Sequence, residues 1–317
     1  MKKISFILLI LAMAALGSCR GGSESGDEIT SQESNGEEQR LENAQLIDTT
    51  LLSFVVSSDT LQAWEEAFDT LSADAWMLVE GSTGMVISSK NADERRYMAS
   101  ITKVMTCLLT LEHGHMDDSI TITDDVLVTK DSRVRRGDKY LVGNLVREMM
   151  LQSDNDAAYA LAKYVGGDTL TFYGMMNEKA AYIGMNGTHF ANPNGMPNDN
   201  NYSTAHDLVV LSRYCMADSA FAEIVGTAFM DIPLLDGRHL PSQNTNALLE
   251  KYDGCIGIKT GYTRQAGCCL ASAAKRDDVT LFLVLLKSKS YTSRFTESAI
   301  LLDHGFQMID KCTARWK

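Results

Sequence analysis

The stretch Tyr97-Met98-Ala99-Ser100-Ile101-Thr102-Lys103 places a serine hydroxyl and a lysine amine three residues apart, where the sequence changes to helical spacing. Apolar residues at positions 104, 108 and 111 continue one face, and a glycine at 114 suits the end of that helix. At this spacing Ser100 and Lys103 share a helix face. A serine hydroxyl becomes a good nucleophile only when a neighbouring base takes its proton, and a lysine can be that base when burial or a second cation lowers its pKa. The stretch therefore predicts a nucleophilic serine with its own base.

Two further motifs complete a pattern. Ser153-Asp154-Asn155 opens another predicted helix, and Lys259-Thr260-Gly261 lies on a predicted strand. Each is weak by itself, because Ser153 suits an ordinary helix N-cap and Lys259 a solvated edge position. Ser-x-x-Lys also recurs at 272–275, and Ser-x-Asn at 89–91 and 242–244. The order of the motifs, and their places on helix start, helix start and strand, make the combination far more specific than its parts.

Together the motifs resemble those of the low-molecular-mass penicillin-binding proteins, the serine-type D-alanyl-D-alanine carboxypeptidases. The resemblance extends through Asn192-Pro193-Asn194-Gly195, Tyr202-Ser203-Thr204-Ala205 and Ala266-Gly267, and covers roughly residues 74–306. In that family the serine attacks the bond between two D-alanines of a peptidoglycan stem pentapeptide, forms an acyl-enzyme and releases the last D-alanine. β-Lactam antibiotics are its covalent inhibitors. The expected partners are therefore stem peptides and β-lactams.

The resemblance assigns a role to each motif residue. Ser100 would be the nucleophile and Lys103 its base. Ser153 would relay a proton to the leaving amine, and Asn155 would hold the substrate amide. Lys259 would keep the cleft positive and help to activate Ser153.

The resemblance also implies a set of substrate-binding residues, namely Thr260, Gly261, Tyr262, Thr263 and Arg294. The backbone N–H groups of Ser100 and Tyr262 would form the oxyanion hole. Thr260, Thr263 and Arg294 match positions that grip the terminal carboxylate, for which the forked donors of arginine are suited. Arg294 lies in a less distinctive stretch, and an exposed helix arginine is its alternative interpretation.

The fold expected is α+β and β-lactamase/transpeptidase-like. Strands at both ends of the chain predict one antiparallel sheet built from both termini and flanked by helices, with an all-helical insertion. The expected strands are 75–80 with a hairpin return at 85–87, 257–260, 268–274 and 279–286. The expected helices start at 100 and span 141–150, 154–165, 169–183, 203–214 and 293–308. Residues 118–136 are expected to form short strands or loops.

The first 54 residues read as export and tethering segments. Residues 1–18 have the two lysines and the apolar core of a signal peptide, and the small residues before Cys19 resemble a lipoprotein cleavage site. Cys19 would then be lipidated, and the acidic stretch 19–54 would be a disordered tether. The protein is expected to be exported and held by lipid on a bacterial membrane, facing the periplasm. An ordinary secretory signal, with Cys19 incidental, is the alternative, and which membrane the lipid enters is left open.

Residues 55–317 are expected to form the catalytic domain, with no C-terminal β-domain because only 56 residues follow Gly261. The net charge of the whole chain is −12, and no basic block is present that would bind nucleic acid. Six cysteines follow Cys19 without a CxxC pattern, so they are expected to be buried free thiols, and neither a metal nor another cofactor is predicted.

Three alternative functions share parts of this pattern. A class A β-lactamase adds a glutamate for its deacylating water, but no glutamate occurs between Glu178 and Glu223. Asp154 is nevertheless shared with β-lactamases, where glycine is more usual in carboxypeptidases. A D,D-endopeptidase uses the same core chemistry. A penicillin-sensing or wall-binding lipoprotein without turnover would usually have lost the serine or a lysine, and all are present here.

Overall fold

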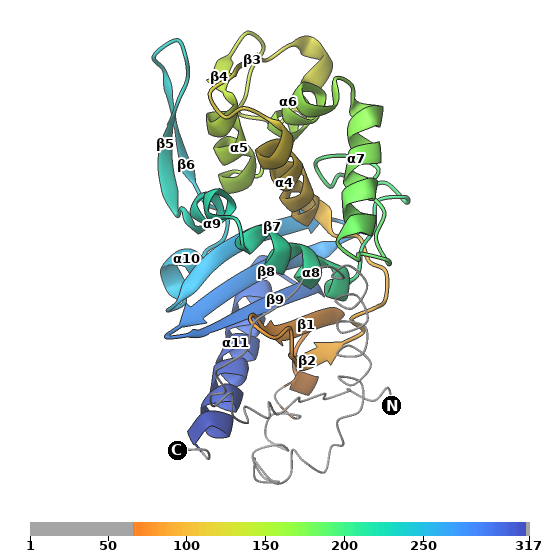
Figure 1. The fold of residues 1–317 in the computed structure, drawn as a ribbon, viewed down its shortest axis with the longest axis vertical. Helices are drawn as coiled ribbons and strands as arrows, with labels where there is room; N and C mark the ends of the chain where they lie inside the picture. The colour runs from red at the N-terminus through yellow and green to blue at the C-terminus, as the bar shows by residue number, and fades with distance from the viewer. Residues whose placement is uncertain (1–65, 67, 315–317) are drawn as a thin grey trace, which may run out of the picture.

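The computed structural model describes residue 66 and residues 68–314. Its centre is a five-stranded antiparallel sheet with the strand order β2-β1-β9-β8-β7. The strands are β1 (Ala75–Glu80), β2 (Val86–Lys90), β7 (Cys255–Thr263), β8 (Gly267–Arg276) and β9 (Val279–Ser288). Segments from the two ends of the described chain therefore form one sheet (Figure 1), which confirms the expected sheet.

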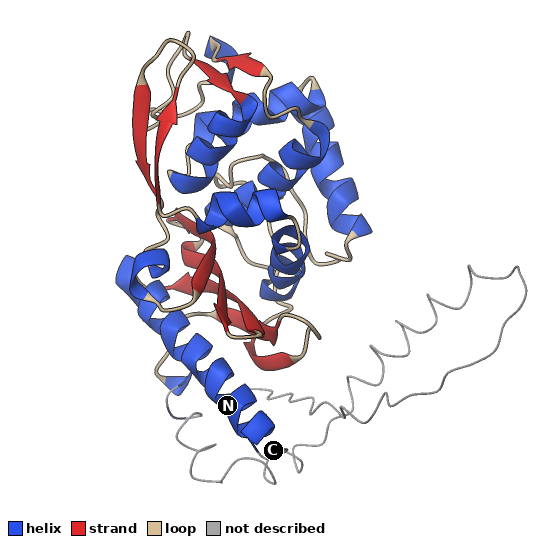
Figure 2. Ribbon diagram, turned by 60° about the vertical axis from the view of Figure 1, so that its left-hand side comes forward, coloured by secondary structure: helices blue, strands red, loops and turns tan. Residues whose placement is uncertain are grey.

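Helices cover both faces of this sheet. α11 (Tyr291–Ala314) packs along one face, and α8 (Ala205–Met216) and α9 (Ser219–Gly226) pack on the other. Figure 2 shows α11 on the far side of the sheet from the helical lobe. Along β9 the side chains alternate between two hydrophobic clusters: Leu283 belongs to the cluster beneath α11, and Val284 to the cluster shared with the helical lobe. The sheet therefore separates two cores.

The helical lobe is built around one buried helix. Its elements are η1 (Ala99–Thr102), α4 (Lys103–His113), α5 (Val142–Leu151), α6 (Asn155–Gly166) and α7 (Thr169–Tyr182). Every residue of α4 from Lys103 to Thr110 is buried, because helices α5 to α9 surround it. The helix that begins at Lys103 is thus enclosed along its first eight residues.

The insertion is not entirely helical, which corrects one detail of the expected fold. It also holds two small two-stranded sheets, β3 (Ser119–Thr121) with β4 (Lys139–Leu141) and β5 (Phe229–Pro233) with β6 (His239–Gln243). The turn of the second hairpin has Gly237 at φ 86°, a left-handed conformation that glycine adopts without strain. β3 lies within residues 118–136, which were expected to form short strands or loops, whereas β4, β5 and β6 were not expected.

Three short elements were also not foreseen, namely α9, η2 (Asp124–Val126) and α10 (Leu248–Lys251). All six cysteines of the described chain are free, and four of them are buried, as expected. Within the described residues, no helix has both the length and the apolar composition needed to cross a bilayer. The predicted signal peptide, Cys19 and the predicted tether lie outside the described residues.

Candidate active site

The first motif forms a direct contact between nucleophile and base. Ser100 lies in the 3-10 turn η1, and α4 begins at Lys103. The Lys103 Nζ donates hydrogen bonds to Ser100 Oγ at 3.0 Å, to Asn155 Oδ1 at 2.8 Å and to the Asn194 carbonyl at 2.6 Å. The nucleophile–base distance is within the range required for proton transfer. One buried amine thus connects the first motif to the second and to the 192–201 loop.

Two glycines let other segments approach the backbone of Ser100. A Cβ atom added to Gly195, whose φ is +84°, would lie 1.9 Å from the carbonyl oxygen of Ala99. A Cβ atom added to Gly261 would lie 3.0 Å from the Ser100 nitrogen. The loop therefore contacts the backbone at Ser100 from one side, and strand β7 contacts it from another side. These two contacts fix the position of Ser100.

Asp154, and not Ser153, is the N-cap of α6, which corrects the local prediction from the sequence. The Asp154 carboxylate accepts hydrogen bonds from the N–H groups of Asp156 at 3.0 Å and Ala157 at 2.9 Å. It also accepts from Ser132 Oγ at 2.9 Å. Ser153 precedes the cap with a φ of 64°, an uncommon conformation outside glycine that is often found at functional sites. Because the cap is made by its neighbour, the Ser153 hydroxyl is not used to begin the helix.

Lys259 is fully buried on β7, which excludes the solvated edge lysine that the sequence left open. Its Nζ donates to the carbonyl of Thr260 at 3.2 Å, and the Thr260 hydroxyl lies 2.6 Å from that of Thr245. Burial, reinforced by the nearby Arg294 guanidinium, lowers the pKa of Lys259 to about 7. Burial, reinforced by the Lys259 ammonium, also lowers the pKa of Lys103 well below its ordinary value, against a smaller raising effect of Asp154. Both lysines can therefore be neutral in a range where exposed lysines are charged.

This pair predicts a bell-shaped pH profile for acylation. Lys103 can accept the Ser100 proton only when neutral, so the rate should rise as pH passes its lowered pKa. Lys259 attracts an anionic substrate only when protonated, so the rate should fall as pH passes about 7. The second-order rate constant for a fluorescent penicillin, measured from pH 5 to 10, checks both limbs. Lys259→Arg keeps the charge and should move the alkaline fall upward; a wild-type rate that stays flat from pH 6 to 9 contradicts the assignment.

Arg294 is also buried beside strand β7. Its side chain is 5% exposed, and Nη1 donates to the carbonyl of Gly261 at 3.2 Å. The guanidinium lies 5.2 Å from the ring centroid of Tyr291 and 4.7 Å from that of Phe295. Its Nε is buried without a hydrogen-bond partner among the described residues. The alternative of an exposed helix arginine is therefore excluded, and one of its donors remains available at the strand that contacts Ser100.

The structure places the other predicted residues around the same strand. Tyr262 is 49% exposed and its ring lies 4.8 Å from that of Tyr291, so its side chain borders the site. The Thr263 hydroxyl accepts from the N–H of Ala266 at 3.0 Å, so it already helps to form the β7–β8 turn. Two contributors were not assigned a role from sequence: the carbonyl of Asn194, although its Asn-Pro-Asn-Gly loop was noted, and Thr245, for which the sequence carries no signal.

The comparisons with known proteins agree with this geometry. The family model described as D-alanyl-D-alanine carboxypeptidase matches residues 62–290. A D-alanyl-D-alanine carboxypeptidase of Streptomyces sp. (strain K15) is 34% identical over 75% of this chain and 89% of its own length. DacF of Bacillus subtilis, with the same description, is 29% identical over 86% of this chain and 72% of its own length. The crystal structure of the Streptomyces K15 DD-transpeptidase aligns with a TM-score of 0.72 and 32% identity, over 75% of this chain and 98% of that one. The chain therefore belongs to the D-alanyl-D-alanine carboxypeptidase family.

Proposed function

We propose that this chain is a serine-type carboxypeptidase that removes the terminal D-alanine from peptidoglycan stem pentapeptides. The observation that carries the proposal is the contact of 3.0 Å between the buried Lys103 Nζ and Ser100 Oγ. Burial lowers the pKa of Lys103 well below its ordinary value, which favours the neutral amine that a base for a serine hydroxyl requires.

The steps of the reaction follow from the roles expected for these groups in this family. Lys103 takes the proton of Ser100 as Oγ attacks the carbonyl carbon of the penultimate D-alanine. The backbone N–H groups of Ser100 and Tyr262 stabilise the oxyanion that forms. Ser153 relays this proton from Lys103 to the amine of the last D-alanine, the C–N bond breaks and that residue leaves. Water then attacks the acyl-enzyme: its hydroxyl joins the acyl carbon, its other proton returns to Ser100 Oγ as the ester bond breaks, and the shortened peptide departs.

Two buried cations support recognition of a free C-terminal carboxylate. Within the described part of the chain, the Lys259 amine donates its only hydrogen bond to the backbone carbonyl of Thr260. Arg294 keeps an unpartnered Nε beside Gly261. Burying two cations without carboxylate partners is costly, and the cost is offset when an anion binds between them. A substrate that ends in a carboxylate supplies that anion, as does the carboxylate of a penicillin.

The loop formed by residues 192–201 argues against efficient β-lactam hydrolysis. The 192–201 segment contacts the site through the Asn194 carbonyl, which is bound to Lys103, and it contains no glutamate that could activate a deacylating water. We therefore expect penicillin to acylate Ser100 and to be released slowly. Cleavage of crosslinked peptides remains the second candidate, because the same acyl chemistry serves both substrates.

Three substrates separate these functions. The protein is incubated with diacetyl-Lys-D-Ala-D-Ala, with a crosslinked muropeptide dimer, and with a fluorescent penicillin. The expected result is D-alanine released from the linear peptide, together with a lasting penicillin label. Cleavage of the dimer alone would indicate an endopeptidase, and rapid loss of intact penicillin without lasting label would indicate a β-lactamase. A stable label without turnover of either peptide would indicate a sensor.

We further propose that Cys19 carries lipid and holds the enzyme on a membrane facing the periplasm. The support is in the sequence: two lysines, an apolar segment and small residues end at this cysteine. Replacement Cys19→Ser should shift the protein from the membrane to the soluble fraction of cells, while Cys312→Ser should not. Equal membrane recovery of wild type and Cys19→Ser would contradict the anchor.

A further inference from the structure

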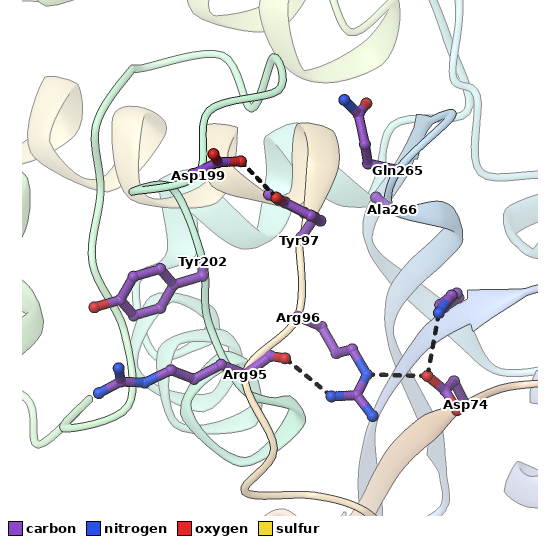
Figure 3. A pocket seen from close by; sticks show the side chains of 9 residues that line it. Asp74, Arg95, Arg96, Tyr97, Asp199, Tyr202, Gln265 and Ala266 are labelled. Atoms are coloured by element: carbon purple, nitrogen blue, oxygen red, sulfur yellow. Dashed lines mark hydrogen bonds and ion pairs between the residues drawn. The ribbon is translucent and has the colours of Figure 1, made fainter.

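A pocket of about 470 Å³ is lined by residues that have no part in the chemistry described above. Figure 3 shows Tyr97 between the loop that carries Asp199 and Tyr202 and the turn that carries Gln265. The Tyr97 hydroxyl donates to the Asp199 carboxylate at 2.7 Å, which links the segment that precedes η1 with the loop. These three segments form three walls of the pocket, and Asp74 and Lys287 complete its lining.

Each of these three walls continues a segment that carries part of the active site. Tyr97 lies three residues before Ser100. Asp199 lies in the loop whose Asn194 carbonyl accepts the hydrogen bond of Lys103. Gln265 follows the end of β7 in the turn to β8. A ligand in the pocket is thus positioned by the same elements that position the reacting groups.

The direction of β7 relates the pocket to the path of a substrate. Thr260 and Gln265 lie on opposite sides of Gly261, and Gly261 is the residue of β7 that contacts the Ser100 backbone. A peptide whose last residue lies toward Thr260, with its scissile carbonyl at Ser100, continues toward the Gln265 end. An extended chain advances about 3.3 Å per residue, so the one or two residues before the D-alanines reach this end of the strand.

The charged side chains that line the pocket differ in whether they have a partner of opposite charge. Asp74 pairs with both Arg96, at 3.0 Å, and Lys287, at 3.5 Å. Arg95 is exposed, its guanidinium lies 4.6 Å from the ring centroid of Tyr202, and no carboxylate pairs with it among residues 66 and 68–314. An arginine supported on an aromatic face but without an anion is suited to bind a carboxylate with two donors.

We propose that this pocket is a subsite for the part of the substrate that precedes the two D-alanines, and that Arg95 binds a carboxylate there. The inference rests on the proposed function, because it requires a peptide acylating Ser100. It makes Arg95 a specificity-determining residue: substrates with an acidic group upstream of the D-alanines are preferred over neutral ones of the same length.

Matched peptides test the subsite. Acetylated tetrapeptides ending in D-Ala-D-Ala carry glutamate at the first or second position. Each is compared with a peptide that has glutamine at the same position. D-Alanine release gives kcat/KM for each peptide. For at least one pair the wild type should prefer glutamate by about three- to fivefold, the size expected for one partly exposed charge pair. Arg95→Gln should reduce that preference to within about twofold. Lys275→Gln removes the same charge at the opposite end of β8 and should retain the preference.

The outcomes separate the subsite from the proposed function. Equal rates for glutamate and glutamine peptides in the wild type, or a preference that survives Arg95→Gln, would overturn the subsite while leaving carboxypeptidase activity intact. If no peptide releases D-alanine, the proposed function fails. The subsite is then judged by how well each peptide slows labelling of Ser100 by fluorescent penicillin, with the same pattern expected across the three proteins.

Discussion

The Ser100→Ala variant is expected to lose covalent labelling by penicillin and D-alanine release, by about 10⁴-fold or more. The variant removes the oxygen that forms the acyl-enzyme, and among the described residues no other hydroxyl accepts a hydrogen bond from Lys103. The buried amine would keep its bonds to Asn155 and Asn194, so the cleft should stay assembled. Labelling with fluorescent penicillin and release of D-alanine from diacetyl-Lys-D-Ala-D-Ala measure the loss.

The chain supplies its own control for that experiment. Ser272 begins the second Ser-x-x-Lys sequence, but it lies fully buried in β8, and its hydroxyl has no hydrogen-bond partner among the described residues. Ser272→Ala therefore leaves no partner unsatisfied, and it should keep wild-type labelling within about twofold. Residual turnover above one per cent in Ser100→Ala, with a thermal midpoint like that of the wild type, would show that Ser100 is not the nucleophile.

The pairing of the motifs could be predicted from sequence because each motif also specifies its local structure. Ser100 and Lys103 are close whenever their segment is helical, and a strand must carry Lys259 somewhere along the sheet. The three motifs come together in space only through tertiary packing, but their order and their structural context in the sequence were enough to predict that they do. The sheet could be predicted for a similar reason, since β8 and β9 are strongly apolar and joined by a tight turn.

Other features depended on contacts that no local pattern encodes. The sequence favoured Ser153 as the N-cap of α6, but the structure uses Asp154, whose carboxylate also accepts a hydrogen bond from Ser132 in a distant loop. The burial of Arg294 depends on the rings of Tyr291 and Phe295 packing around it. Helical periodicity predicts neither the Asp154 cap nor the burial of Arg294. An arginine on a helix is expected to be exposed unless its neighbours are known to cover it.

The β5–β6 hairpin was missed although part of its signal was present. An Asp-Gly pair at 236–237 stands between two runs of mixed polarity. Pro233 and Pro241 argue against a strand, since proline cannot donate to a ladder. In a two-stranded ribbon, however, each strand has a free edge, and there both prolines are tolerated. A pattern that excludes a central strand therefore does not exclude a hairpin.

Lys103→Gln should reduce the acylation rate by about 10²- to 10⁴-fold, the range of a lost general base. Glutamine can still donate to the Asn194 carbonyl and to Asn155 Oδ1, so the wall of the cleft should stay in place while the proton acceptor is lost. The rate constant for fluorescent penicillin measures the effect, and the thermal midpoint checks the fold. Lys275→Gln, in the second Ser-x-x-Lys sequence, is the matched control and should acylate at the wild-type rate.

A second substitution at Lys103 separates proton transfer from charge. Arginine keeps a positive charge and hydrogen-bond donors but cannot give up its proton, so Lys103→Arg should be as slow as Lys103→Gln if the amine acts as a base. The acidic limb of the pH profile should also disappear in both variants, because that limb reports deprotonation of Lys103. If Lys103→Arg acylated within about tenfold of the wild type, the lysine would serve as a fixed charge. In that case the Ser100 proton would have to be taken by another group, and Lys259, whose pKa lies near 7, would be the first to examine.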